Sequence, residues 1–204
     1  MKRPYGGVNA DDRRAERRAK LLLAAMKLFA DRGFQRTKIT ELCTEAGVST
    51  RNFYEEFEKK EDVLLVLHDT INATAMHQIR ARLSTVEDAG LETRIGVLVG
   101  VFVDSVTANP RAPRLVYVEA VGVNAELEAQ HQQWVAKWAR FIQDEAQRGV
   151  DRGEATRRDY RLTAYAMVGA ITGLLREWQA HEPPLDTAEV TAEIKAMLLS
   201  ALTR

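Results

Sequence analysis

The sequence predicts an all-α protein of about nine helices. Apolar residues recur at the three- and four-residue spacing of helix faces along the whole chain. No segment shows the sustained apolar/polar alternation of a half-buried strand. Residues that begin or end helices, mainly glycine, proline and small polar residues, separate the apolar segments. The length of 204 residues suits one domain or a small N-terminal domain joined to a larger body.

Three helices are expected within residues 1–60. The first has a continuous apolar face and ends at Gly33, a residue typical of helix C-termini. The second presents an apolar face made of Ile39, Leu42, Cys43 and Ala46. Gly47 should allow a tight turn through a positive φ. Ser49 or Thr50 should then cap a third helix that ends near Phe57.

Six further helices are expected after residue 60. They are predicted over residues 61–83, 87–107, 110–121, 125–152, 159–181 and from 186 almost to the C-terminus. Asn109 followed by Pro110 is typical of an N-cap with a first-turn proline. The proline pair at 183–184 should end the eighth helix, and Asp186 and Glu189 have the spacing of a reciprocal cap. We therefore expect an N-terminal domain over residues 1–60 and a helical body over 61–204.

The charge distribution points to a nucleic-acid partner at the N-terminal end. The net charge is zero, with 29 basic and 29 acidic residues, which alone argues against such a partner. Residues 1–60, however, hold 14 Lys and Arg against 9 Asp and Glu, a net charge of +5, so the rest carries −5. This asymmetry is expected when one end of a protein faces phosphates, although chance clustering of solvated charge would produce it too.

Other classes of protein are disfavoured by what the sequence lacks. One cysteine, Cys43, cannot form an intramolecular disulfide and fits a reducing, cytoplasmic setting. No apolar run is long enough to span a membrane, and the start has no apolar signal segment. The sequence has no glycine-rich phosphate loop, and its four histidines lack metal-ligand spacing. We therefore expect no catalytic residues, no metal and no cofactor.

Residues 39–46 and 50–57 have the pattern of a helix-turn-helix, two short helices joined by a glycine-containing turn. Packing of their apolar faces leaves hydrogen-bonding side chains on the outward face of the second helix, namely Thr50, Arg51, Asn52 and Tyr54. Such side chains suit base edges and phosphates, although a generic helical hairpin can share the apolar spacing. Glu55 and Glu56 follow on the same helix and are expected to be solvated.

Residues 18–67 resemble the N-terminal domain of TetR-family transcriptional regulators. The resemblance rests on Ala24-Ala25, Leu28-Phe29, Gly33-Phe34, Thr37-Lys38-Ile39, Ala46-Gly47-Val48-Ser49, Phe53-Tyr54, Phe57 and Lys60-Glu61, in that order. It implies a homodimer that binds a near-palindromic double-stranded DNA operator, acts as a repressor and is released by a small, largely apolar ligand. Activation in place of repression stays open, as do the effector, the operator and the regulated genes.

The resemblance assigns DNA contacts to Thr37, Lys38, Thr50, Arg51, Asn52, Tyr54 and Lys60. The Thr37 hydroxyl and nearby amides are expected to hold a phosphate, and Tyr54 and Lys60 to reach the DNA backbone. Lys38 replaces a small hydroxyl residue that is common in the family, and Arg51-Asn52 replaces a frequent Gly-Thr pair, so the operator sequence should be its own. The basic residues near the N-terminus either reach DNA or form a solvated helix face; they are Lys2, Arg3, Arg13, Arg14, Arg17 and Arg18.

In the body, the resemblance places a ligand cavity among the fifth to eighth helices. Its candidate lining residues are His68, Phe102, Tyr117, His131, Trp134, Trp138 and Met167, although aromatic residues at helical spacing are more often plain core. The last two helices are the expected dimer face, with Ala166, Gly169, Ala170, Gly173, Leu174, Ile194, Met197 and Leu198. The same stripe could instead be intramolecular core. A helical protein-interaction module without DNA binding is the alternative function, and salt-dependent binding of random duplex DNA separates the two.

Overall fold

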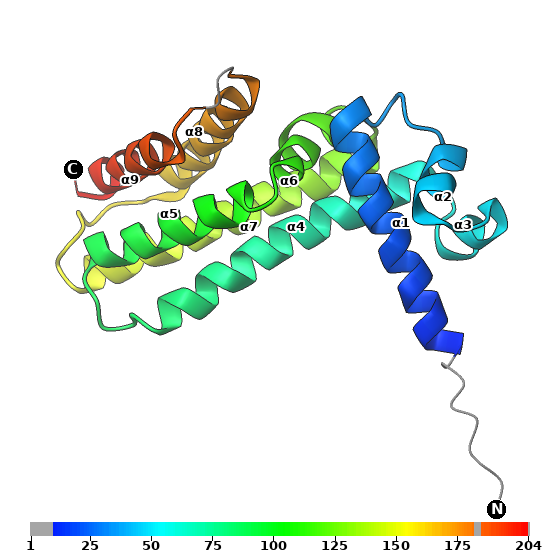
Figure 1. Ribbon diagram of the computed structural model, residues 1–204. Helices are drawn as coiled ribbons and strands as arrows, with labels where there is room; N and C mark the ends of the chain where they lie inside the picture. Colours follow the sequence, from blue (N-terminus) through cyan, green and yellow to red (C-terminus); the bar gives the residue numbers. More distant parts are fainter. Residues whose placement is uncertain (1–9, 182–184, 204) are drawn as a thin grey trace, which may run out of the picture. The chain divides into compact units, whose positions relative to one another are not determined.

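The computed structural model describes residues 10–181 and 185–203, and every regular element in these ranges is helical (Figure 1). The elements are α1 (Ala10–Arg32), α2 (Ile39–Ala46), α3 (Thr50–Glu56), α4 (Lys60–Ser84), α5 (Leu91–Thr107), α6 (Arg111–Arg114), a π-helical turn η1 (Leu115–Glu119), α7 (Ala125–Asp151), α8 (Arg161–Ala180) and α9 (Thr187–Thr203). The prediction of nine α-helices without strands is confirmed for these ranges. The proline pair at 183–184 and the basic residues Lys2 and Arg3 lie outside them.

The chain forms two compact units, Met1–Leu67 and His68–Arg204. The division falls inside α4, whereas the sequence suggested a boundary after residue 60. Residues 60–67 of α4 therefore belong to the first unit and the rest of the helix to the second. None of the described helices is both long and apolar enough to cross a membrane.

The first unit is built around α1, against which α2 and α3 pack. Its fully buried side chains include Phe29, Phe34, Leu42 and Phe53. The rings of Phe29 and Phe34 meet edge to face with centroids 5.1 Å apart, the favoured geometry of an aromatic pair. Cys43 is a free, buried cysteine in the same core, and burial raises the pKa of its thiol. The predicted helix faces thus form one apolar core.

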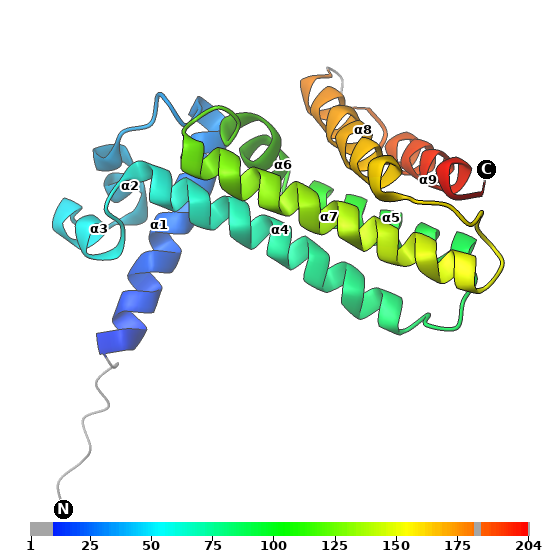
Figure 2. The same cartoon turned by 180° about the vertical axis from the view of Figure 1, so that it is seen from behind.

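In the second unit, α5 packs against α7 and α9, and α7 packs against α8. Figures 1 and 2 both show α4, α5 and α7 running side by side, with α8 and α9 paired along them. A buried ion pair joins α5 to α7, since the Arg94 guanidinium donates to the Glu145 carboxylate at 2.7 and 2.8 Å. Arg94 also donates to the carbonyls of Leu83 and Val86, so it satisfies backbone acceptors at the end of α4.

Two helix boundaries differ from the sequence prediction. The fifth helix begins at Leu91 rather than at residue 87, because the Glu154 carboxylate accepts from the Leu91 amide and fixes the start there. The helix expected over 110–121 is divided into α6 and the π-helical turn η1. In η1 the Ala120 amide donates to the Leu115 carbonyl at 3.0 Å, a bond across five residues that defines a π-helical turn.

Candidate functional sites

The turn between α2 and α3 has the geometry that the sequence predicted. Gly47 adopts φ 65° and ψ 35°, the left-handed conformation that glycine takes at little cost. Ser49 is the N-cap of α3, and its hydroxyl accepts from the Asn52 amide at 3.1 Å. Phe53 then points into the core with no exposed surface. These contacts fix which face of the short helix α3 remains outside.

The outward face of α3 carries the polar residues predicted to contact DNA. The Arg51 side chain is 89% exposed, and Tyr54 is 56% exposed. Thr50 is exposed and Asn52 half-buried. Arg51 pairs with Glu55 one turn later, at 3.3 Å between Nε and Oε1. Contact of this face with DNA stays a prediction.

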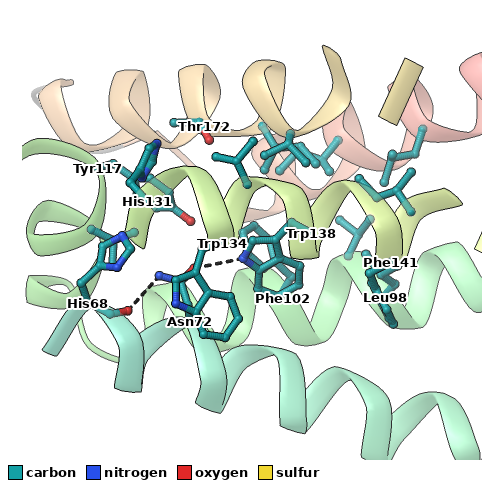
Figure 3. Close-up of a pocket in the computed structure, with 18 residues that line it drawn as sticks. His68, Asn72, Leu98, Phe102, Tyr117, His131, Trp134, Trp138, Phe141 and Thr172 are labelled. Atoms are coloured by element: carbon teal, nitrogen blue, oxygen red, sulfur yellow. Dashed lines mark hydrogen bonds between the residues drawn. The ribbon is translucent and has the colours of Figure 1, made fainter. Parts of the chain in front are cut away.

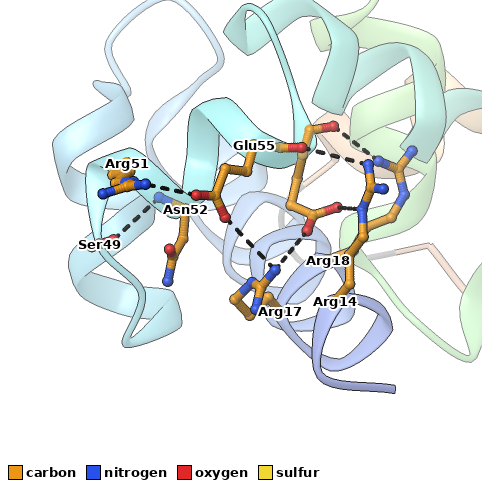
Figure 4. A network of polar contacts seen from close by, with 8 residues as sticks. Arg14, Arg17, Arg18, Ser49, Arg51, Asn52 and Glu55 are labelled. Carbon is orange, nitrogen blue, oxygen red and sulfur yellow. Dashed lines mark hydrogen bonds and ion pairs between the residues drawn. The ribbon is translucent and has the colours of Figure 1, made fainter. Parts of the chain in front are cut away.

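Glu56, expected at the solvated surface, is instead buried, with 1% of its side chain exposed. Its carboxylate accepts from Arg14 Nε at 3.2 Å and from Arg17 Nη2 at 3.3 Å. Arg18 donates to the Glu56 carbonyl at 3.1 Å and lies 4.4 Å from the centroid of the Phe57 ring. Figure 4 shows the three arginines of α1 converging on the end of α3. These arginines therefore bind α3, and sequence spacing carried no signal for this cluster because its partners lie about 40 residues apart.

Two further predicted DNA contacts have structural partners within the first unit. Thr37 is 1% exposed and its hydroxyl donates to the Gly33 carbonyl at 2.9 Å, so the expectation that this hydroxyl faces a phosphate is corrected. Lys60 Nζ donates to the carbonyls of Phe34 and Thr37, both at 2.8 Å. Burial lowers the pKa of Lys60. Lys38 is exposed and caps α2, since its amide donates to Glu41 Oε2 at 2.8 Å.

The second unit contains a cavity of about 50 Å³ lined by 18 residues from α4, α5, η1, α7, α8 and α9 (Figure 3). Its walls are mainly aliphatic and aromatic, and its polar lining residues are His68, Asn72, Tyr117, His131 and Thr172. Six of the seven candidate residues line it, namely His68, Phe102, Tyr117, His131, Trp134 and Trp138. Met167 does not line it and packs against the core instead.

The two tryptophans of the cavity are anchored to α4 through their indole N–H groups. Trp134 Nε1 donates to Asp69 Oδ1 and Trp138 Nε1 donates to Asn72 Oδ1, both at 3.0 Å. Asn72 in turn donates to the carbonyl of His68 at 2.9 Å. The donors of both rings are thus satisfied, as buried indoles require, and the bonds fix α7 to α4.

A polar corner of the cavity contains His68, Tyr117 and His131, and Figure 3 shows it at the opposite end from Phe141 and Leu98. His68 is fully buried, and its Nδ1 lies 3.0 Å from Gln130 Oε1. Burial, together with the neighbouring His131, lowers the pKa of His68 to about 4. Burial also raises the pKa of Tyr117, which keeps its hydroxyl protonated. At neutral pH His68 and Tyr117 are therefore polar but uncharged.

A second depression, which we call the basic groove, is defined by Arg80, Lys137, Arg140 and Arg161 and has a volume of about 840 Å³. It shares Trp134 and Phe141 with the cavity. Lys137 Nζ lies 4.0 Å from the centroid of the Trp134 ring, and the Arg80 guanidinium lies 5.8 Å from that of Phe141. The aromatic rings thus separate the apolar cavity from a cationic surface. This groove was not predicted from the sequence, although the three-residue spacing of Lys137 and Arg140 was a signal for it.

The candidate dimer face is only partly available for contact with a second chain. On α8, Ala166, Gly169 and Gly173 are exposed, and Ala170 and Leu174 are half-buried, as is Met197 on α9. Leu162 and Tyr165, not predicted, extend this face and are 73% and 43% exposed. Ile194 and Leu198 are fully buried within the chain and line the cavity, so their assignment to the dimer face is wrong.

Residues 21–67 match the family model of the bacterial regulatory proteins of the tetR family. The HTH-type transcriptional activator FasR of Mycolicibacterium smegmatis is 27% identical over 187 residues, which cover 91% of this chain and 83% of FasR. The fatty acid degradation regulator FadR from Bacillus halodurans superposes with a TM-score of 0.82 at 20% identity, over 90% of this chain and 94% of FadR. FadR from Bacillus subtilis, crystallised in complex with stearoyl-CoA, superposes with a TM-score of 0.76 at 16% identity, over 90% of this chain and 98% of that FadR.

The family match covers the unit that carries α3, and the likeness to FasR extends the relationship over nine-tenths of the chain. Both FadR structures share the fold of the second unit as well as the first. The chain is therefore similar to transcriptional regulators of the tetR family, and residues 21–67 match the N-terminal domain of that family.

Proposed function

We propose that the protein is a homodimeric, ligand-responsive regulator whose α3 reads the major groove of a near-palindromic operator. The observation that carries this proposal is the outward face of α3, where Arg51 and Tyr54 extend from a helix held rigidly by its N-cap and by Glu56. One such helix contacts few bases. Two-fold symmetry doubles the contacts when the half-sites lie about one helical turn, roughly 34 Å, apart.

Arg51 must exchange its partner when DNA binds. An exposed pair one helical turn apart, such as Arg51 with Glu55, contributes roughly 0.3–0.5 kcal/mol. A bidentate contact of arginine with a guanine edge discriminates against a wrong base by about 1–3 kcal/mol. The exchange of Glu55 for a guanine as the partner of Arg51 is thus favourable. In the proposed complex, Asn52 contacts neighbouring bases, and Thr50, Tyr54 and Lys38 contact phosphates.

Operator binding by alanine variants tests this assignment. Arg51→Ala and Tyr54→Ala should each weaken binding by about 1–3 kcal/mol, measured by fluorescence anisotropy on a duplex that the protein selects from random DNA. Arg157→Ala removes the same charge as Arg51→Ala from an exposed position in the second unit and should change little. Unchanged affinity in both α3 variants rejects the proposal.

The exposed face of α8 is the proposed dimer contact. At Gly169 and Gly173, apart from neighbouring residues of α8 itself, no atom of the described residues lies within 4 Å of the position that a Cβ would occupy, so a second helix can approach their backbone closely. Leu162→Asp should dissociate the dimer in sedimentation experiments. Leu23→Asp, on α1, changes a leucine of similar exposure (68%) and should leave the dimer intact. A Leu162→Asp protein that stays dimeric contradicts this face.

A fatty acyl-CoA thioester is the proposed effector. The apolar cavity suits a hydrocarbon chain, and the basic groove on the other side of Trp134 and Phe141 suits phosphates. The stearoyl-CoA complex of the Bacillus subtilis FadR supports this class of ligand. In an engineered protein, an apolar cavity of roughly 150 Å³ binds benzene. Because the cavity here measures about 50 Å³, an acyl chain enters only when the surrounding side chains move apart.

This enlargement gives the ligand different affinities for two forms of the protein, which is the condition for any ligand-driven shift. We place the response in α4, because its middle lines the cavity while its first residue, Lys60, bonds to the turn before α2. The ligand-bound form is proposed to hold operator DNA less tightly. Release of this kind relieves repression where the operator overlaps a promoter, and it ends activation where the bound protein recruits the polymerase.

Titration with stearoyl-CoA tests the effector class. Stearoyl-CoA should weaken operator binding, whereas coenzyme A without an acyl chain should not. The double variant Lys137→Gln/Arg140→Gln should bind stearoyl-CoA less tightly, because it removes two cations from the basic groove. The control, Arg82→Gln/Arg157→Gln, removes two exposed cations elsewhere on the second unit. Stearoyl-CoA that neither binds nor changes operator affinity contradicts the proposal.

A further inference from the structure

His68 contains a buried polar atom that the fold leaves without a partner. The residue has no exposed surface and lines the cavity, and within the described residues its Nε2 makes no hydrogen bond. Leaving a buried acceptor or donor unpaired is unfavourable, so such an atom in a cavity wall calls for a partner inside the cavity.

The chemistry of that partner follows from the other ring nitrogen. His68 Nδ1 faces the amide oxygen of Gln130 at 3.0 Å, and an amide oxygen can only accept. Nδ1 therefore carries the proton. Because burial keeps the ring neutral, with the pKa lowered to about 4, Nε2 has a lone pair and no hydrogen. The missing partner must be a hydrogen-bond donor.

Within the described residues, no lining side chain donates to His68 Nε2. The indoles of Trp134 and Trp138 donate to Asp69 and Asn72, and the Asn72 amide donates to a backbone carbonyl. Tyr117 also lines the cavity, and its hydroxyl makes no hydrogen bond to any residue in the described ranges. Among the described residues, this corner therefore combines an unpaired acceptor, His68 Nε2, with the hydroxyl of Tyr117 and the imidazole of His131, whose ring centroid lies 5.8 Å from that of His68.

We propose that the effector carries a hydroxyl group, which donates to Nε2 of His68 and accepts from the hydroxyl of Tyr117. A hydroxyl is the smallest ligand group that both donates and accepts, so one such group suits both the His68 acceptor and the Tyr117 donor. The inference rests on the proposal that the cavity binds an apolar ligand, and it narrows that ligand to one with a hydroxyl on its hydrocarbon part. A bound water fits the same two groups, and a ligand without a donor displaces that water without replacing its hydrogen bond to His68.

The test compares two probes of equal size, 1-decanol and 1-methoxynonane, by isothermal titration calorimetry. Both contain one oxygen that accepts, but only the alcohol donates. The wild-type protein should bind 1-decanol about 5- to 150-fold more tightly, the range expected for leaving one buried polar atom unpaired. His68→Phe should abolish this preference, while His68→Gln, which keeps an acceptor, should retain part of it.

Tyr117→Phe separates the two contacts and does not depend on the folding of the His68 variants. This variant should weaken the binding of both probes to the same extent, because both accept a hydrogen bond from Tyr117. It should leave the preference for the alcohol unchanged. His181→Phe, at an exposed histidine beyond α8, controls for the exchange of imidazole for phenyl.

Equal binding of the two probes by wild type overturns the inference, as does a preference that survives in His68→Phe. Failure of 1-decanol to bind overturns it too. Binding of stearoyl-CoA then distinguishes a failure of the proposed hydroxyl from a failure of the proposed cavity ligand. If stearoyl-CoA binds, only the hydroxyl is wrong; if it does not, the proposed cavity ligand is wrong as well.

Discussion

Glu56→Gln should loosen helix α3 without changing its outward face. The Glu56 carboxylate is the point where Arg14 and Arg17 of α1 are tied to the end of α3. Glutamine keeps the size and one acceptor oxygen but removes the negative charge. Glu55→Gln makes the same change of charge one residue earlier, on a side chain that is 47% exposed, so the two variants form a matched pair.

The magnitude follows from the burial of each partner. Breaking a fully buried ion pair costs about 3–5 kcal/mol, and an exposed pair contributes about 0–1 kcal/mol. The Glu56 side chain is 1% exposed, whereas the side chains of Arg14 and Arg17 are 63% and 29% exposed. Solvent screens the two arginines, so we expect a loss between these limits, about 1–3 kcal/mol. For Glu55→Gln we expect a change within about 0.5 kcal/mol.

Amide hydrogen exchange in α3 measures this loss locally. The Phe57 amide, which donates to the Phe53 carbonyl at 2.9 Å, should exchange about 5- to 150-fold faster in Glu56→Gln than in wild type. Operator affinity should fall in Glu56→Gln and not in Glu55→Gln, although both lose one negative charge. Equal exchange rates in the two variants would refute the anchoring role of Glu56.

Three further outcomes are expected in urea unfolding. Gly47→Ala should lower the free energy of unfolding by about 1–2 kcal/mol because of the φ of +65° alone, since Gly47 has room for an added Cβ. Gly100→Ala, inside α5 and equally open, should raise the free energy of unfolding by about 0.5–1 kcal/mol. The folded-state pKa of His68 lies below its unfolded value, so the unfolded chain binds more protons between pH 6.5 and about 4. Stability should fall by about 3 kcal/mol as the pH drops through this window, and His68→Gln should remove this part of the dependence. Arg94→Met should cost up to about 3–5 kcal/mol, because it leaves the buried Glu145 with only the partly exposed Arg148, 3.9 Å away. The double variant Arg94→Met/Glu145→Leu should recover most of the loss, and additive costs would contradict the coupling.

Features governed by local rules could be predicted from the sequence. The left-handed Gly47, the Ser49 cap and the outward direction of Arg51 and Tyr54 all depend on residues within one or two helical turns of each other. Helix periodicity has the same range, which explains why nearly every helix was found at its expected place. Six cavity-lining residues were predicted by combining this periodicity with the family resemblance.

Features that depend on distant partners could not be predicted in this way. Glu56 is buried because three arginines from another helix surround it, although its neighbours on α3 are exposed. Leu91 begins α5 because Glu154, 63 residues later, caps it. Ile194 and Leu198 share the apolar spacing of a dimer face, yet they point into the cavity. Periodicity identifies an apolar face but not the surface that this face will meet.

The small volume of the cavity bears on how a ligand acts. If the cavity enlarges by separation of α7 from α4, the indole bonds of Trp134 and Trp138 must break; if those bonds hold, α7 and α4 move together. Leaving a buried indole N–H unpaired costs about 1–3 kcal/mol, whereas burying an acyl chain yields roughly 0.8 kcal/mol per CH₂ group. Burial of about eight methylene groups, roughly 6 kcal/mol, therefore offsets even the largest cost of breaking both bonds. Because Lys60 begins the same helix and bonds to Phe34 and Thr37, a displacement of α4 would act directly on the turn that precedes α2.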